Sequence, residues 1–185
     1  MKLRYRFKQA DSADEFEQIF RLNHSVFADE LEQYETTESQ RIVDKFHDKN
    51  RYIVALFEER VIGMVSVHAE APFSVAERLA DPAILASYGS LIEVRQLAVK
   101  TEHRTGVVMA GLLLGLYEHA RAHDTVVISG HLDKAGMYRE LGFHDLGPPV
   151  PSGRALYVPM AIGVADLAQR QARWKRRLQS SSKVC

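Results

Sequence analysis

The chain has 185 residues and a mass of 20.9 kDa, which allows one domain with a buried core and leaves no room for a second large domain. Hydrophobic residues make up 46% of the sequence and 24 basic residues balance 24 acidic ones, so the composition excludes a histone-like protein and an acidic-tail protein. The balance is uneven, because residues 164–185 contain six basic residues and one acidic residue, which leaves the preceding body acidic.

The chain opens with a predicted strand and a predicted helix. Residues 3–8 alternate between polar and apolar side chains in the manner of a short strand. Ser12 followed by Glu15 forms a capping box, in which each side chain can bond a free backbone amide at the start of a helix. The buried face of this helix would consist of apolar residues at helical spacing, namely Phe16, Ile19, Phe20, Val26 and Phe27.

A predicted hairpin and an irregular insertion follow. Residues 51–58 and 61–69 are rich in β-branched side chains and are separated by Glu59 and Arg60, which predicts an antiparallel hairpin with a two-residue turn. Residues 72–89 contain two prolines and predict a short helical insertion with loops.

Strands and helices alternate in the C-terminal half. The predicted elements are a strand over 91–100, a helix over 106–123, a buried strand over 125–129, a short helix over 135–141 and a strand over 154–161. The prolines and glycines of 147–153 indicate a turn before the last strand. This order predicts an α/β domain of three layers, in which helices cover both faces of a mixed central sheet. We assign residues 1–161 to this domain and residues 162–185 to a basic helical tail.

A candidate anion site lies between the 91–100 strand and the 106–123 helix. A helix N-terminus leaves about four backbone amides unpaired and carries partial positive charge. Gly106 would let a phosphate approach the backbone closely, and Arg104 could add a charge-assisted hydrogen bond. An ordinary turn with an exposed arginine would have the same sequence, so both interpretations stay open.

Two stretches of this half resemble GNAT-superfamily acyltransferases. Ala135, Tyr138, Gly142 and Phe143 match the A-x-x-Y-x-x-x-G-F signature of that superfamily, and HRTGVV at 103–108 is similar to its Q/R-x-x-G-x-G/A acyl-donor loop. The resemblance implies a GNAT-like fold, in which two neighbouring parallel strands splay apart and hold the pantetheine arm of an acyl thioester. The domain over 1–161 would then be an acyltransferase domain.

The resemblance also implies which residues act. The residues that would contact the pantetheine and its phosphates are Leu97, Ala98, Val99, Arg104, Thr105, Gly106, Val107, Val108 and Met109. Glu93 would accept a proton from the incoming amine, directly or through water, and Tyr138 would hydrogen-bond the thiol sulfur. The alternatives are a surface carboxylate at 93 and a packing tyrosine at 138.

A narrower resemblance lies in the first half. RLNHSVFADE at 21–30 is similar to the R-L-R-x-x-V-F-x-x-E stretch of long-chain N-acyl amino acid synthases and, more distantly, of acyl-homoserine-lactone synthases, with Asn23 in place of the second arginine. The donor loop departs from the GNAT pattern at His103 and at Val108, whose side chain would crowd a diphosphate. The single phosphate of an acyl carrier protein would be accommodated more easily than the diphosphate of coenzyme A.

We therefore expect an N-acyltransferase that moves an acyl group, with acetyl as the first choice, from a coenzyme A thioester to a primary amine by direct attack. One alternative is a long-chain N-acyl amino acid synthase-like enzyme that uses the phosphopantetheine of acyl carrier protein. A second is a non-catalytic module that binds acyl-coenzyme A or a peptide. The acceptor could be a small molecule or a peptide, and the sequence does not identify it.

No metal cofactor is expected. His119 and His123 lie four residues apart on one predicted helix, but no third ligand stands at the spacing of a metal motif. Residues 164–178 predict a basic helix that could meet an acidic carrier protein or a membrane surface. It could instead pack on its own domain or on a second protomer in a homodimer. Nucleic acid is not the expected partner, because Trp174 stands alone among the basic residues.

The sequence also bears on the compartment. Cys185 is the only cysteine, so no intramolecular disulfide can form and a reducing environment is expected. No stretch approaches the roughly 18 consecutive apolar residues of a transmembrane helix, and the first residues lack the apolar core of a signal peptide. We therefore expect a cytoplasmic protein without a transmembrane segment.

Overall fold

The computed structural model describes residues 5–183 and the side chains of residues 5–180. A mixed eight-stranded sheet runs through the molecule in the order β1-β2-β3-β4-β5-β8-β6, and β7 pairs with β8 beside this path. The strands are β1 (Tyr5–Gln9), β2 (Arg51–Phe57), β3 (Arg60–His68), β4 (Leu91–Val99), β5 (Thr125–His131), β6 (His144–Asp145), β7 (Val150–Ser152) and β8 (Ala155–Gly163). Among the described pairings, β4 with β5 is the parallel one.

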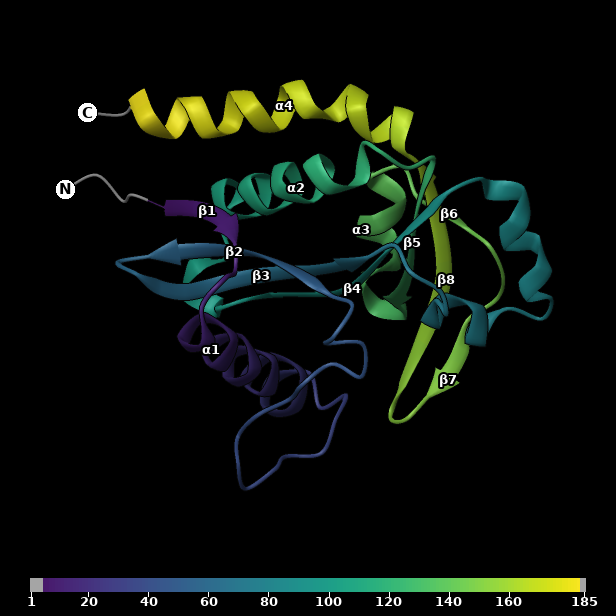
Figure 1. Ribbon diagram of the computed structural model, residues 1–185, viewed down its shortest axis with the longest axis horizontal. Helices are drawn as coiled ribbons and strands as arrows, with labels where there is room; N and C mark the ends of the chain where they lie inside the picture. Colours follow the sequence, from purple (N-terminus) through teal and green to yellow (C-terminus); the bar gives the residue numbers. More distant parts are fainter. Residues whose placement is uncertain (1–4, 184–185) are drawn as a thin grey trace.

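Helices cover both faces of this sheet, which confirms the predicted three-layer α/β architecture (Figure 1). The helices are α1 (Ala13–Asn23), which continues as a π-helical segment (His24–Glu30), α2 (Gly106–Ala120), α3 (Ala135–Glu140) and α4 (Val164–Lys183). Helix α1 lies on one side of the sheet, whereas α2 and α4 lie on the other. Short 3₁₀ turns occupy Ser74–Arg78, Pro82–Tyr88, Thr101–His103 and Leu132–Lys134.

The alternation of side chains along β2 explains why both layers are needed. Successive residues of a strand point to opposite faces of the sheet. Ile53 and Ala55 accordingly belong to the larger core with α2, whereas Tyr52, Val54 and Leu56 belong to the smaller core with α1. The strand is therefore apolar on both faces.

The hairpin between β2 and β3 differs from the prediction by one residue. The two turn residues are Glu58 and Glu59, with φ angles of 48° and 60°, and Arg60 already pairs with Phe57. A two-residue hairpin turn needs central residues with positive φ, because only that twist matches the flanking strands. The prediction of Glu59 and Arg60 as the turn was therefore wrong, because the register places Arg60 in β3.

The segment predicted as a turn over 147–153 contains a strand as well. Residues Val150–Ser152 form β7, which pairs with β8 through a tight turn at Gly153, where φ is 59°. A glycine suits this position because other L residues rarely adopt that conformation. The β7–β8 hairpin stands beside the end of β5 and forms one wall of the cavity described below.

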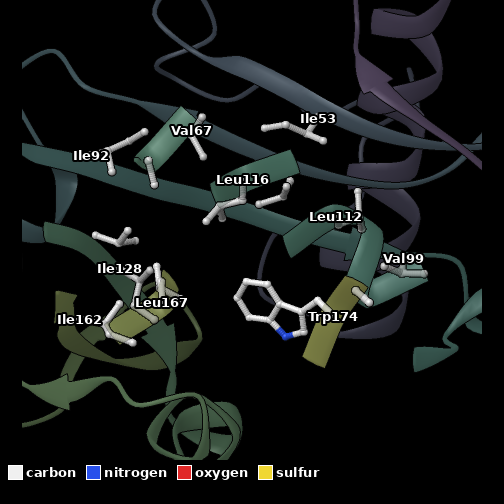
Figure 2. Close-up of a cluster of buried hydrophobic side chains, with 14 of the residues drawn as sticks. Ile53, Val67, Ile92, Val99, Leu112, Leu116, Ile128, Ile162, Leu167 and Trp174 are labelled. Carbon is white, nitrogen blue, oxygen red and sulfur yellow. The ribbon is translucent and has the colours of Figure 1, made fainter. Parts of the chain in front are cut away.

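The basic helix predicted near the C-terminus is α4, and it packs on its own domain along α2. Val164, Leu167 and Trp174 are buried in the larger core, and Figure 2 shows the Trp174 ring among the side chains that also include Leu112. Arg173, Lys175, Arg176 and Arg177 are exposed, whereas Arg170 is half-buried. Of the helices described over residues 5–183, none combines the length and the apolar character needed to cross a membrane.

Candidate active site

The site begins where β4 and β5 separate. The two strands pair at four positions only, from Leu91 opposite Thr125 to Val94 opposite Ile128. Beyond these positions β4 continues beside β3, whereas β5 continues beside β8. The facing edges of the two strands therefore present backbone groups that are not paired with each other, and an extended ligand can bond them. This is the splay that the GNAT resemblance predicted.

The gap opens into a cavity of about 890 Å³. Its walls come from the π-helical segment, the ends of β4 and β5, α3 and the β7–β8 hairpin, and its lining includes Val26, Phe27, Leu97, Ser129, Tyr138 and Tyr157. A volume of this size lies within the range of small-molecule sites. The mixture of apolar walls and a few polar groups suits a ligand with an apolar chain and a reactive polar end.

The sequence-predicted site residues fall into two groups. Those that line the cavity are Leu97, Val99, Arg104, Thr105, Gly106, Met109 and Tyr138. Those outside its lining are Glu93, Ala98, Val107 and Val108. Val108 is fully buried and its side chain belongs to the core, so it does not crowd the surface of the turn as the sequence suggested.

Arg104 is already engaged in an ion pair. Its Nε donates to the Val99 carbonyl oxygen at 3.0 Å, and both terminal nitrogens donate to the Glu30 carboxylate. The hydrogen bond from Arg104 lowers the pKa of Glu30 below its ordinary value. This bidentate contact closes the turn against the π-helical segment, so Arg104 shapes the cavity mouth.

The start of α2 is capped and covered. The Thr105 hydroxyl accepts a bond from the Val108 amide at 3.4 Å. A Cβ at Gly106 would lie 2.8 Å from Arg177 Cζ, so the absence of a side chain at 106 is what lets this α4 residue approach. Helix α4 thereby reaches the predicted anion-binding turn, a contact between distant segments that the sequence alone did not reveal.

Tyr138 lies on α3 with its ring against β5. A Cβ at Gly130 would come within 2.9 Å of the tyrosine ring, and Phe143 meets that ring edge-on with centroids 5.9 Å apart. Burial raises the pKa of Tyr138 above its ordinary value. The hydroxyl is protonated at neutral pH, as that of an ordinary tyrosine is, and Tyr138 lines the cavity.

Glu93 is buried behind the cavity wall. Its carboxylate accepts bonds from the Ser74 and Val75 amides at 2.8 and 2.7 Å and from the Ser74 hydroxyl at 2.7 Å, and it lies 3.0 Å from His68 Nε2. Burial by itself would raise the pKa of Glu93, but the bonds from His68 and Ser74 outweigh it and lower the pKa. The carboxylate is thus a fully bonded anion that anchors the Ser74–Arg78 turn to β4.

Sequence reasoning missed the polar residues beside this turn. Arg95 on β4 pairs with Asp44 at 3.0 Å and contacts the Ser74 hydroxyl. Arg78 donates to the Ser74 carbonyl oxygen at 3.1 Å and lies over the Tyr157 ring, 4.9 Å from its centroid. Asp44 and Arg78 belong to irregular segments without periodicity, so no local pattern singled them out. Among residues 5–183 no three His, Cys, Asp or Glu side chains gather as metal ligands.

The family model described as FeeM, N-acyl amino acid synthase, matches residues 18–163. The structure of FeeM, an N-acyl amino acid synthase from uncultured soil microbes, superposes with a TM-score of 0.74 and 18% identity over 94% of this chain and 98% of that one. BjaI, a CoA-dependent acyl-homoserine lactone synthase solved with SAM and isopentyl-CoA, superposes with a TM-score of 0.69 and 22% identity over 88% of this chain and 82% of that one. A proposed N-acetyltransferase from Lactobacillus plantarum superposes with a TM-score of 0.63 and 16% identity over 86% of this chain and 98% of that one. The comparison with curated proteins found no match.

Proposed function

Because this chain belongs to the FeeM family of N-acyl amino acid synthases and is thus an N-acyltransferase, we propose that it joins a long acyl chain to the α-amino group of an amino acid. The observation that carries the proposal is the β4–β5 gap opening into a cavity of about 890 Å³ with an apolar wall. Beside a pantetheine arm and a small acceptor, a cavity of this size can hold an acyl chain longer than acetyl. The long-chain alternative is therefore favoured over the acetyl transfer that the sequence put first.

The proposed donor is a phosphopantetheine thioester, carried either by coenzyme A or by acyl carrier protein. Its arm would lie along the unpaired edge of β4 at Leu97–Val99, and its phosphate would approach the start of α2. The acyl chain would extend past Val26 and Phe27, which line the cavity. Backbone amides of the open β4 edge are suited to hold the oxyanion that forms on the thioester carbonyl.

The proposed reaction is a direct attack. The free amine of the acceptor forms the new C–N bond at the thioester carbonyl carbon, and the C–S bond breaks as the intermediate collapses. The proton that the amine nitrogen loses balances the proton that the departing thiolate gains. The Tyr138 hydroxyl, which is protonated at neutral pH, would donate a hydrogen bond to that thiolate. Glu93 would act as a positioning residue, since its oxygens are bonded to the Ser74–Arg78 turn.

Product formation with defined donors tests the function. The full chain would be incubated with a mixture of proteinogenic amino acids and with acetyl, octanoyl or palmitoyl thioesters, each supplied on coenzyme A or on acyl carrier protein. We expect mass spectrometry to detect N-acyl amino acids from the longer chains, and the better carrier identifies the donor. Acetyl products alone would contradict the long-chain assignment. Donor binding without any product would contradict the proposed activity and favour a non-catalytic binding module.

Replacing Tyr138 with phenylalanine is expected to lower kcat by about 10- to 100-fold, because the departing thiolate loses its hydrogen bond. The ring and its contact with Gly130 are retained, so the KM for the thioester should stay within about twofold. Steady-state kinetics with the best donor would measure both constants. Tyr117→Phe is the matched control, since Tyr117 lies on α2 outside the cavity lining. An unchanged kcat in Tyr138→Phe would remove the hydroxyl from the reaction.

A further inference from the structure

The Ser74–Arg78 turn is fixed at the cavity wall by a buried polar network. The amide and hydroxyl of Ser74 both bond Glu93, and the same hydroxyl contacts Arg95. The Ser74 carbonyl oxygen accepts a bond from Arg78 Nη1 at 3.1 Å. Ser74 therefore links the buried carboxylate to two arginines that line the cavity. A turn held in this way presents Arg78 in a defined position.

The charges of the cavity arginines are not equally balanced. Three arginines line the cavity. Arg95 pairs with Asp44, and Arg104 pairs with Glu30. Arg78 has no carboxylate partner among the described residues, and the nearby Glu77 pairs instead with Lys45 at 2.9 Å. Arg78 thus supplies a positive charge to the cavity that the described part of the chain does not neutralise.

The remaining donors of Arg78 form one edge of the guanidinium. Nη1 is used by the Ser74 carbonyl oxygen, whereas Nε is buried and has no hydrogen-bond partner within the described residues. The Tyr157 ring beneath the guanidinium, at 4.9 Å, restricts its orientation. Because Nε has no accessible surface, a carboxylate in the cavity would approach Arg78 through Nη2, attracted by a positive charge that no described carboxylate balances.

We propose that Arg78 binds the carboxylate of the acceptor, an inference that rests on the proposed acylation of an amino acid. The carboxylate and the reacting amine of an α-amino acid are attached to the same carbon. Binding the carboxylate at Arg78 therefore keeps the amine inside the cavity that Leu97 and Tyr138 also line. Arg78 would thereby select amino acids over amines that lack a carboxylate, with Glu93 and Ser74 holding it in place.

The test compares the best amino acid acceptor of the wild-type enzyme with the primary amide of the same amino acid. For wild type, we expect kcat/KM to be about 10- to 100-fold lower for the amide, because the charge-assisted bonds to Arg78 are lost. Arg78→Met should lower kcat/KM for the amino acid by a similar factor, mainly through KM, and leave the amide nearly unaffected. Arg78→Lys should restore part of the preference.

Controls separate the possible failures. Arg121→Met removes an exposed arginine at the end of α2 and should leave kcat/KM unchanged for both acceptors. Thermal unfolding would show whether Arg78→Met is folded, and the KM for the thioester should be unchanged. If wild type forms N-acyl products from both acceptors equally well, the Arg78 assignment fails although the acylation stands. A raised KM for the thioester in Arg78→Met would also overturn the Arg78 assignment, because it would mean that Arg78 binds the acyl donor. Absence of any N-acyl product would instead refute the proposed function.

Discussion

Glu93→Ala is expected to lower the free energy of unfolding by about 3–5 kcal/mol, because it removes one partner from a buried network of charged and polar groups. The Ser74 and Val75 amides and the His68 ring would lose their acceptor in a region that water does not reach. Such donors cost free energy when they stay unpaired. Denaturant unfolding followed by circular dichroism would measure the loss.

Glu93→Gln is the matched variant, since it keeps the shape of the side chain and removes the charge. The pKa of Glu93 is lower in the folded protein than its ordinary value of 4.5. The stability that its charge contributes is therefore complete above that value and is lost as the pH falls below it toward the folded pKa. The difference in stability between wild type and Glu93→Gln should accordingly shrink in acid.

The same variant distinguishes a positioning role from a catalytic one. If Glu93 acts through the Ser74–Arg78 turn, Glu93→Gln should raise the KM for the amino acid acceptor more than it lowers kcat. The pH profile of kcat should keep its shape, because a positioning Glu93 is not the ionisable group whose titration shapes that profile. A stable Glu93→Gln protein with normal KM and a kcat reduced about 100-fold or more would instead identify the carboxylate as the base.

Trp174→Ala should lower the free energy of unfolding by about 3–5 kcal/mol, the usual cost of removing a large aromatic side chain from a core. Trp174 is 7% exposed and packs in the larger core, with Leu112 and Leu167 nearby (Figure 2). The unfolding transition should remain single, because α4 shares that core with α2 and the sheet. Calorimetry would measure both the loss and the number of transitions.

Arg173→Ala is the control for this helix. Arg173 is exposed and adjacent to Trp174, so its removal should change stability by no more than about 0.5 kcal/mol. A normal free energy of unfolding in Trp174→Ala, or a separate early transition in wild type, would mean that α4 is a detachable tail. Either result would contradict the packing of α4 into the common core.

The fold could largely be predicted from the sequence because its elements are locally encoded. The β-branched runs predicted the central strands, and the Ser12–Glu15 capping box predicted the start of α1, where Ser12 does cap the helix. The strand β7 was missed because three residues rich in turn formers carry no periodic signal. The hairpin turn was misplaced because its register depends on how β2 and β3 pair, which single residues do not show.

The family resemblance pointed to residues that lie at the cavity, but it could not show where distant segments meet. Leu97, Met109 and Tyr138 line the cavity, and the roles predicted for them stay predictions. Glu93 was correctly placed on β4, but its surroundings come from the turn at Ser74, which is 19 residues away. The insertion that carries Arg78 has no periodicity, so only the folded structure reveals that it faces the cavity.

The position of α4 has a consequence for how the protein is made. Its buried face covers α2, and among the described elements it leaves the ribosome after every strand that shares its core. The apolar surface of α2 that Trp174 covers therefore stays exposed during synthesis until α4 has been translated. Nascent chains halted before Val164 should be prone to association and to binding by chaperones, because transiently exposed apolar surface promotes both.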